Sequence, residues 1–138
     1  MKRLVSRGII FIDNKVVLLK RIRKENGKYL HYYAIPGGGV ELNESLEEAC
    51  IREVKEEVSL DVTIDKYLGV EEYDKGIVHY YKVNYLGGVP ILGGEEKEHN
   101  NPDNYYEVAL IDIKDLDNIY IYGKGVDKIK EAFLLGKN

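Results

Sequence analysis

Three glutamates stand at positions from which they could bind one metal ion together. Glu53, Glu56 and Glu57 lie near the end of a predicted helix over residues 45–58, and residues three and four apart share a helix face. Three close carboxylates repel one another, oppose the negative end of the helix dipole and raise one another's pKa values. A divalent cation would relieve these effects, and oxygen ligands favour magnesium, manganese or calcium over zinc.

Neighbouring basic residues offer a simpler interpretation of the same glutamates. On a solvated helix face Arg52 and Lys55 would neutralise the acids, and Arg52 stands four residues before Glu56, a favourable spacing for an ion pair. The glutamates, however, continue a helix stripe that begins with small and apolar side chains, at Leu46, Ala49 and Cys50. Because a purely solvated face would not continue a core-facing stripe, we favour the metal-binding interpretation.

A glycine run precedes the helix, in the sequence Pro36-Gly37-Gly38-Gly39. Backbone without side chains can approach a ligand closely, and its N–H groups can bind phosphate oxygens. By itself a run of three glycines indicates only a turn. Because this run comes just before the carboxylate helix, we predict that Gly37, Gly38 and Gly39 shape a pocket for a metal ion and a phosphate.

Helices and strands in mixed order must position these residues. Ser45 can cap the carboxylate helix, and Glu48 completes a Ser-x-x-Glu capping box. Runs rich in β-branched and aromatic residues predict strands over residues 4–12, 16–19, 29–35, 61–73, 77–86 and 105–111. Hairpin links together with helical connections predict an α/β fold in a single domain over residues 1–138, with a mixed sheet packed between helices.

Three further segments complete the predicted organisation. The polar residues 20–28 are expected to form a loop or a frayed strand end. Residues 87–104, rich in Gly, Glu, Asn and Pro, are expected to form a long loop, and loops of that length are often functional. Val126, Ile129 and Phe133 lie at helical spacing and predict an amphipathic helix towards the C-terminus.

Composition argues against several classes of protein. With 20 basic and 24 acidic residues, the formal net charge is −4, and the chain lacks the strongly basic surface of a nucleic-acid-binding domain. Its apolar runs are too short to span a bilayer or to serve as a signal peptide, so a cytoplasmic location is the simplest expectation. The single cysteine, Cys50, excludes an internal disulfide and a cysteine metal cage. An acidic protein that binds phosphates needs an added positive charge, for which a divalent metal is the obvious source.

The spacing of the glycine and the charged residues resembles the Nudix box. Gly38 is followed after five residues by Glu44 and, after seven more, by residues 52–60, Arg-Glu-Val-Lys-Glu-Glu-Val-Ser-Leu. The family pattern is Gly, five residues, Glu, seven residues, then Arg-Glu-apolar-any-Glu-Glu-any-Gly-apolar. Ser59 replaces the last glycine, which follows the helix where a positive φ is common, so serine implies strain or a different turn. The match over residues 38–60 indicates a small MutT-type Nudix hydrolase with an α/β/α sandwich fold.

This resemblance implies a reaction and a set of residue roles. Nudix hydrolases cleave the diphosphate linkage of a nucleoside diphosphate joined to a further group X, by attack of water on phosphorus with Mg²⁺, or alternatively Mn²⁺, as cofactor. Glu53, Glu56 and Glu57 would hold the metal, and Glu53 would also orient or deprotonate the water. Arg52 would fix one of these carboxylates through its planar fork, and Glu44 would brace the loop or Arg52.

The general base and the substrate contacts lie outside the box. Some family members place the base in a later loop, where this chain has Glu95, Glu96 and Glu98, and the MutT-type pattern favours Glu98. Arg21 and Arg23 would face one side of a strand and could bind phosphates, or could lie on a solvated strand end. The twelve tyrosines are expected chiefly to pack, with base stacking by one of them as the alternative.

The resemblance narrows the substrate only slightly. Relatives that prefer ADP-ribose or dinucleoside polyphosphates often carry a Pro or Tyr shortly after the box, whereas residues 75–78 here are Lys-Gly-Ile-Val. We therefore expect a nucleoside triphosphate or an unassigned small nucleotide-like substrate, with no nucleic-acid or membrane partner, and a homodimer is common in the family. The alternative function is a Nudix-fold sensor that binds a nucleotide or nucleotide sugar without cleaving it. Such domains tend to lose box glutamates, and all of them are present here.

Overall fold

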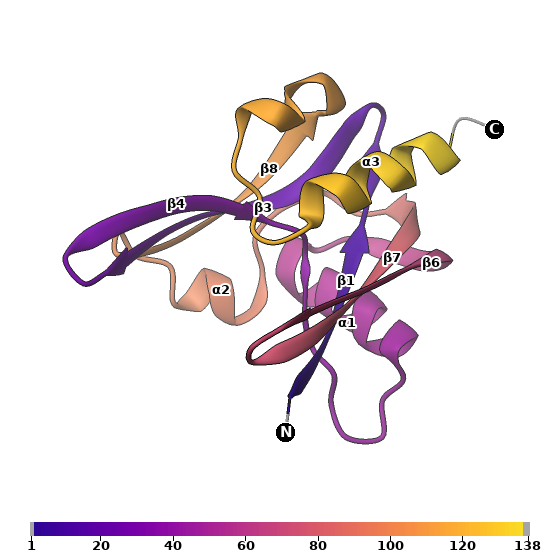
Figure 1. Ribbon diagram of the computed structural model, residues 1–138, viewed down its shortest axis with the longest axis horizontal. Coiled ribbons are helices and arrows are strands. Elements are labelled where there is room, and N and C mark those ends of the chain that lie inside the picture. The colour runs from indigo at the N-terminus through magenta and orange to yellow at the C-terminus, as the bar shows by residue number, and fades with distance from the viewer. Residues whose placement is uncertain (1, 137–138) are drawn as a thin grey trace.

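The computed structural model describes residues 2–136, in which strands and helices alternate in mixed order (Figure 1). The strands are β1 (Arg3–Ile9), β2 (Phe11–Ile12), β3 (Lys15–Glu25), β4 (Lys28–Ala34), β5 (Gly37–Gly39), β6 (Asp61–Tyr73), β7 (Gly76–Gly87) and β8 (Asn104–Asp112). The helices are α1 (Leu46–Val58), α2 (Gly94–Glu98), the 3-10 helix η1 (Ile113–Asn118) and α3 (Gly125–Leu135).

The strands form two sheets. The first is mixed, in the order β5-β1-β7-β6, because β1 is parallel to β7 while the other two pairs are antiparallel. In the second sheet β3 pairs antiparallel with β2, β4 and β8. The β3–β4 hairpin extends from the body as a long arm (Figure 1). The parallel pair within an otherwise antiparallel sheet is the mixed sheet that the sequence predicted.

Two hydrophobic clusters form the core, and β3 contributes to both of them. Because successive side chains of a strand face opposite sides, Val16 and Leu18 pack in the cluster beneath α3, while Val17 and Leu19 pack in the cluster beneath α1. Helices α1 and α3 thus cover opposite faces of the strands (Figure 1). This arrangement confirms the predicted α/β/α sandwich.

Helix α1 begins with the predicted capping box. The Ser45 hydroxyl accepts a hydrogen bond from the Glu48 N–H at 3.0 Å, and the Glu48 carboxylate accepts one from the Ser45 N–H at 2.9 Å. These two bonds satisfy N–H groups that have no partner within the helix. The local sequence therefore fixes where α1 starts, and with it the positions of the glutamates two turns later.

The end of α1 keeps the turn of the Nudix box although serine replaces glycine. Ser59 adopts the left-handed conformation, with φ 64° and ψ 29°, and its N–H donates to the Lys55 carbonyl. A side chain makes this conformation costly by about 1–2 kcal/mol. The Ser59 hydroxyl donates to the Ile91 carbonyl at 3.0 Å, which offsets part of that cost.

Three segment predictions need correction. Residues 20–28 form a loop or frayed end only at the turn of Asn26 and Gly27, because β3 continues to Glu25, paired with β4 throughout and with β8 as far as Arg23. Pairing on both sides satisfies the backbone of this polar segment, and that pairing is not visible in the local sequence. The strand predicted over residues 4–12 is interrupted at Ile10, which separates β1 from β2. Residues 87–104 contain the short helix α2 and are not a loop throughout.

Helix α3 confirms the amphipathic helix predicted near the C-terminus. Ile129 is fully buried, Val126 is partly buried against the same cluster, and the half-buried Phe133 meets the ring of Phe11 with ring centroids 5.7 Å apart. Within residues 2–136, no helix combines the length and the apolar character needed to cross a membrane.

Candidate active site

The three box glutamates of α1 lie in different environments. Glu57 is buried, with only 7% of its surface exposed, Glu53 is half-buried and Glu56 is exposed. The Glu57 carboxylate accepts a hydrogen bond from the backbone N–H of Gly37 at 2.8 Å, which ties the last turns of α1 to β5. Of the three glutamates, Glu57 and Glu53 therefore face the protein interior, and Glu56 faces solvent.

Burial changes the proton affinity of the two inner glutamates. It raises the pKa of Glu57 to about 8, although the Gly37 hydrogen bond and the charge of Arg7 act in the opposite direction. Burial also raises the pKa of Glu53 above its ordinary value, against the stabilising effect of Arg52 on the carboxylate. Both groups would gain from a nearby cation, because a positive charge favours the ionised form.

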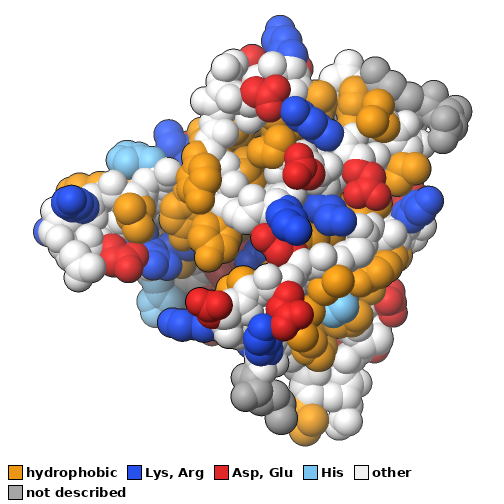
Figure 2. Space-filling model, viewed as in Figure 1, with side chains coloured by type: hydrophobic (Ala, Val, Ile, Leu, Met, Phe, Trp, Pro, Cys, Tyr) orange, Lys and Arg blue, Asp and Glu red, His pale blue; other side chains and the backbone are white. Residues whose placement is uncertain are grey.

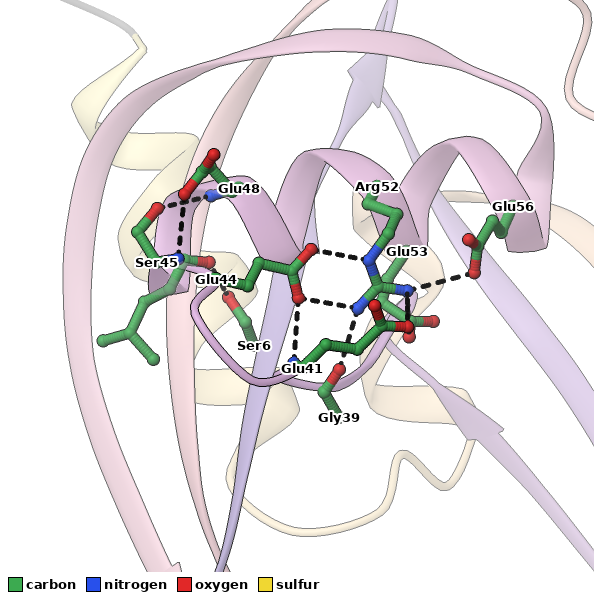
Figure 3. Close-up of polar contacts among 10 residues, drawn as sticks. Ser6, Gly39, Glu41, Glu44, Ser45, Glu48, Arg52, Glu53 and Glu56 are labelled. Carbon is green, nitrogen blue, oxygen red and sulfur yellow. Dashed lines mark hydrogen bonds and ion pairs between the residues drawn. The ribbon is translucent and has the colours of Figure 1, made fainter.

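Arg52 joins the box residues into one polar network (Figure 3). Its guanidinium donates two hydrogen bonds to Glu44, at 2.6 and 2.9 Å, and one to the Gly39 carbonyl at 3.0 Å. The same group also donates to Glu53 at 3.0 Å and to Glu56 at 3.2 Å. The hydrogen bonds from Arg52 and from the Glu41 N–H lower the pKa of Glu44 to about 2. Glu44 therefore stays ionised and orients Arg52, as the bracing role implied.

The glycine run is strand β5, and each of its residues has a reason to lack a side chain. A Cβ at Gly38 would lie 2.6 Å from the carboxyl carbon of Glu53, and a Cβ at Gly39 would lie 2.7 Å from a guanidinium nitrogen of Arg3. At Gly37 a Cβ would overlap the backbone of β1. Glycine at these positions leaves space for charged groups to approach the strand closely.

The segment before and within α2 packs on the C-terminal end of α1. The Gly93 N–H donates to the Glu57 carbonyl at 3.0 Å, and the Ile91 N–H donates to the Val58 carbonyl. This packing brings Glu96, which is half-buried, close enough to raise the pKa of Glu57 and that of Glu53.

A cleft of about 1520 Å³ opens in front of the box residues. Figure 2 shows a hollow between the projecting arm and the body, with hydrophobic, basic and acidic side chains around it. The five arginines of the sequence all line this cleft, at Arg3, Arg7, Arg21, Arg23 and Arg52, and no lysine of the described residues does. Eight glutamates line it as well, at Glu25, Glu41, Glu53, Glu56, Glu57, Glu71, Glu95 and Glu96.

The structure brings most of the predicted site residues to this cleft and leaves Glu98 and Glu44 outside its lining. The three glycines, the box residues Arg52, Glu53, Glu56 and Glu57, and both Arg21 and Arg23 line it. Glu98 is exposed and does not line the cleft, whereas Glu95 and Glu96 from the same helix do. Glu44 lies behind the cleft wall, where it contacts Arg52.

Arg21 and Arg23 reach the cleft with their guanidinium groups already engaged. Arg21 donates to Asn104 at 2.7 Å and lies 3.7 Å above the ring of Tyr106, with Tyr32 on its other side at 5.8 Å. Arg23 forms an exposed ion pair with Glu25 at 2.9 Å. Arg21 therefore packs against aromatic residues that line the cleft, and the charge of Arg23 is neutralised by Glu25 of the same strand.

The donor atoms at the box suit a hard divalent cation. They are carboxylate oxygens beside glycine backbone, the ligand type that magnesium and manganese prefer. Within residues 2–136, however, no three acidic, histidine or cysteine side chains converge as a metal-binding group. Glu53 and Glu56 point to Arg52, and Glu57 points to the Gly37 N–H. The residues fit a cation in their chemistry, and each is engaged by Arg52 or by β5.

Sequence reasoning missed two arginines of the cleft, Arg3 and Arg7, and considered a third charged residue, Glu96, only after Glu98 as a candidate base. Arg3 and Arg7 stand on β1 and flank the glycine strand, and Glu96 faces the buried glutamates from α2. The alternation of Arg3, Val5 and Arg7 along a strand would have placed both arginines on one face. Nothing in the sequence indicated that β5 would pair with that strand.

Comparison with known proteins identifies relatives of the chain. A family model described as the NUDIX domain matches residues 2–124. The chain is 33% identical over 112 residues to the ADP-ribose pyrophosphatase of Methanocaldococcus jannaschii, covering 81% of this chain and 63% of that protein. It is 32% identical over 124 residues to the NAD-capped RNA hydrolase NudC of Vibrio atlanticus, covering 87% of this chain and 44% of that protein. The chain thus spans less than two thirds of the length of either relative.

Solved structures agree with the fold. The MutT protein from Methanosarcina mazei Go1 superimposes with a TM-score of 0.70 over 99% of this chain and 96% of that chain, at 17% identity. At that identity the likeness concerns the fold alone. Nudix hydrolases are generally dependent on divalent metals, in keeping with the donor set described above. The box glutamates meet Arg52 and the glycine strand at one cleft. Since the NUDIX family model also covers almost all of the described residues, the chain belongs to the Nudix family.

Proposed function

We propose that this protein hydrolyses the diphosphate linkage of a nucleoside diphosphate derivative, with Mg²⁺ as cofactor and an ADP-ribose-like molecule as the leading substrate. The observation that carries the proposal is the meeting of the α1 glutamates with the glycine strand at one large cleft lined by all five arginines. Carboxylates suit a metal, and arginines suit phosphate. A site that combines both is suited to a metal-assisted attack on phosphorus.

The charge balance of the cleft supports the need for a cation. Eight glutamates against five arginines leave the lining negative, which by itself would repel a diphosphate. Bound Mg²⁺ would neutralise phosphoryl oxygens and stabilise the negative charge that develops on them, and Mn²⁺ is the alternative. Glu53 and Glu57 are the inner donors and Glu56 is the outer one.

Arg52 and Glu44 would act by holding these donors in place. Arg52 contacts both Glu53 and Glu56, and its own orientation is fixed by the two hydrogen bonds to Glu44. A planar guanidinium held at several points keeps carboxylates in one arrangement better than a flexible lysine would. In this proposal both residues are positioning residues, and neither contacts the substrate.

The residue best placed to accept the proton of the attacking water is Glu96 rather than Glu98. Glu96 is half-buried, lines the cleft and interacts electrostatically with Glu53 and Glu57. Glu98 lies two residues on, at the exposed end of α2. A general base has to reach the reacting water, so position comes before any other criterion.

Three observations support a substrate with a bulky group X. The relative from Methanocaldococcus jannaschii carries the name ADP-ribose pyrophosphatase. The cleft of about 1520 Å³ also exceeds the roughly 300–1,000 Å³ typical of small-molecule sites. Along its far wall the rings of Tyr32 and Tyr122 lie 6.2 Å apart, beside the exposed Tyr120, and offer faces on which a base could stack. These features favour ADP-ribose over the nucleoside triphosphate expected from residues 75–78.

A substrate panel tests the proposal directly. Phosphate or nucleotide release is measured with Mg²⁺ from ADP-ribose, nucleotide sugars, dinucleoside polyphosphates and nucleoside triphosphates. We expect the highest kcat/KM for ADP-ribose, and its loss in Glu57→Gln but not in Glu131→Gln, an exposed glutamate of α3. A higher kcat/KM for nucleoside triphosphates would reject ADP-ribose as the substrate and keep the hydrolytic function. Binding of ADP-ribose without turnover of any compound would replace the enzyme by the sensor alternative.

A further inference from the structure

The basic residues that line the cleft are arginines. Within residues 2–136, the five arginines line it and no lysine does. Arginine presents a planar fork that binds two phosphate oxygens at once, whereas lysine acts as a point charge. A cleft that uses only arginine is therefore organised for oriented oxyanions and not for general attraction of negative charge.

Three of the five guanidinium groups are already committed to other partners. Arg52 donates to Glu44, Glu53 and Glu56, and Arg23 is paired with Glu25. Arg21 donates to Asn104 and lies against the ring of Tyr106. The positive charges of Arg52 and Arg23 are thus offset by carboxylates, and Arg21 is held by an amide oxygen and an aromatic ring.

Arg3 and Arg7 are the two arginines without an ion pair among the described residues. The Arg7 guanidinium donates only to the Ile35 carbonyl, at 2.8 Å, and the Arg3 guanidinium has no hydrogen-bond partner within residues 2–136. An arginine has five N–H groups, so most of the donors on both side chains remain available. Among the described residues of the cleft, the two arginines without an ion pair therefore both stand on β1.

The glycine strand is built around these two side chains. β1 and β5 pair antiparallel, with Arg7 opposite Gly37 and Val5 opposite Gly39, so Arg3 and Arg7 face the same side as Gly37 and Gly39. A Cβ at Gly39 would come 2.7 Å from the Arg3 guanidinium, and one at Gly37 would come 2.6 Å from Arg7 Cγ. Gly39 thus leaves space for the Arg3 guanidinium, and Gly37 leaves space for the backbone of β1 and the stem of Arg7.

Gly38 serves the opposite face of the same strand. Its missing Cβ leaves space for the Glu53 carboxylate, which comes from α1. β5 therefore has the Glu53 carboxylate against one face and the side chains of Arg3 and Arg7 against the other. A diphosphate lying at this strand would meet the donors for a metal and the arginines together.

We propose that Arg3 and Arg7 are the residues that bind the phosphoryl oxygens of the substrate, in place of Arg21 and Arg23. The class of ligand, a diphosphate carried by a nucleoside, rests on the proposed function. Residues four apart in a strand have Cα atoms about 13 Å apart. Two long side chains at that spacing suit two linked phosphoryl groups better than a single phosphate ion.

Equilibrium binding without any divalent metal isolates the contribution of the arginines. ADP and adenosine, which differ only in the diphosphate, are titrated calorimetrically into the chain in the presence of a chelator. We expect Arg3→Gln and Arg7→Gln each to weaken ADP binding by roughly tenfold, as loss of a charged hydrogen bond predicts, and to leave adenosine unchanged. Lys130→Gln, which removes one positive charge from α3 outside the cleft, should match the wild type.

A second variant tests the geometry without removing a charge. Gly39→Ala would push the flexible end of Arg3 aside, so it should weaken ADP binding while the melting temperature changes little. Gly87→Ala is its matched control, because a Cβ there meets nothing within 4 Å. Since Arg3 is exposed, Arg3→Gln and Gly39→Ala carry the test even where Arg7→Gln disturbs folding.

The outcomes distinguish a failure of this proposal from a failure of the proposed hydrolytic function. Wild-type ADP affinity in both Arg3→Gln and Gly39→Ala, or loss confined to Arg21→Gln and Arg23→Gln, would overturn the assignment. Failure of the wild type to bind ADP would overturn it as well. Arginine-dependent ADP binding in a chain that hydrolyses no member of the panel would support the two arginines and reject the enzyme.

Discussion

The buried carboxylate of Glu57 accepts the Gly37 N–H at 2.8 Å, and this bond, like the one from Arg52 to the Gly39 carbonyl, joins α1 to the glycine strand. It holds an ionisable group where solvent is almost excluded, so the pKa of Glu57 is raised to about 8 from an ordinary 4.5. The metal-free protein must therefore either keep a proton on Glu57 or bear a buried negative charge.

Metal-free protein should lose stability as the pH rises from about 4.5 to about 8. The folded state binds the Glu57 proton more tightly than the unfolded state does, so its contribution is fully present below pH 4.5 and is lost as the pH passes through about 8. Denaturant unfolding in a chelator, at several pH values and constant ionic strength, measures the slope. In Glu57→Gln, whose amide oxygen can still accept the Gly37 N–H, that part of the slope should vanish. An unchanged slope in the variant would show that other groups cause it.

Removal of divalent metal should abolish hydrolysis. A chelator is expected to lower kcat by at least about a hundredfold, because stabilisation of the developing phosphoryl charge would be lost, and added Mg²⁺ or Mn²⁺ should restore it. Glu53→Gln should lower kcat by a similar factor at saturating Mg²⁺ without a large change in melting temperature. Activity that resists the chelator would rule out the metal role.

Glu96 and Glu98 give a direct test of the general base. Both substitutions to glutamine remove one negative charge from α2, but only Glu96 lines the cleft. Glu96→Gln should lower kcat by roughly a hundredfold or more, the usual size of a general-base contribution, and Glu98→Gln should have a much smaller effect. The reverse order would return the role to Glu98, as the MutT-type pattern suggested.

Substitutions at Ser59 should separate backbone strain from hydrogen bonding. Ser59→Ala keeps the left-handed conformation but loses the hydrogen bond to the Ile91 carbonyl, whereas Ser59→Gly loses the bond and relieves the strain. The alanine variant should therefore be less stable than the glycine variant by about 1 kcal/mol. Chemical denaturation of both variants measures this difference. Equal stability would mean that the turn relaxes when the hydroxyl is removed.

Local spacing accounts for the parts of the site that the sequence anticipated. The capping box from Ser45 to Glu48 and the spacing of Glu53, Glu56 and Glu57 depend only on the geometry of a single helix. The Nudix box adds the glycine strand, because the family motif fixes its distance from that helix. The mixed sheet followed from the order of strand and helix patterns, which survives small errors in boundaries such as those at Ile10 and Glu25.

Tertiary structure alone decided which charges are available to a substrate. Arg21 and Arg23 were expected to bind phosphates or to lie on a solvated strand end, and the structure adds their contacts with Asn104 and Glu25, which no local pattern reveals. Arg3 and Arg7 gained their place because β5 pairs with β1 across about thirty residues of chain. Strand pairing and charge neutralisation are long-range events. The sequence therefore determined the fold family and the carboxylates of the box, and the assembled structure determined which arginines are paired with acids and which glutamates of α2 line the cleft.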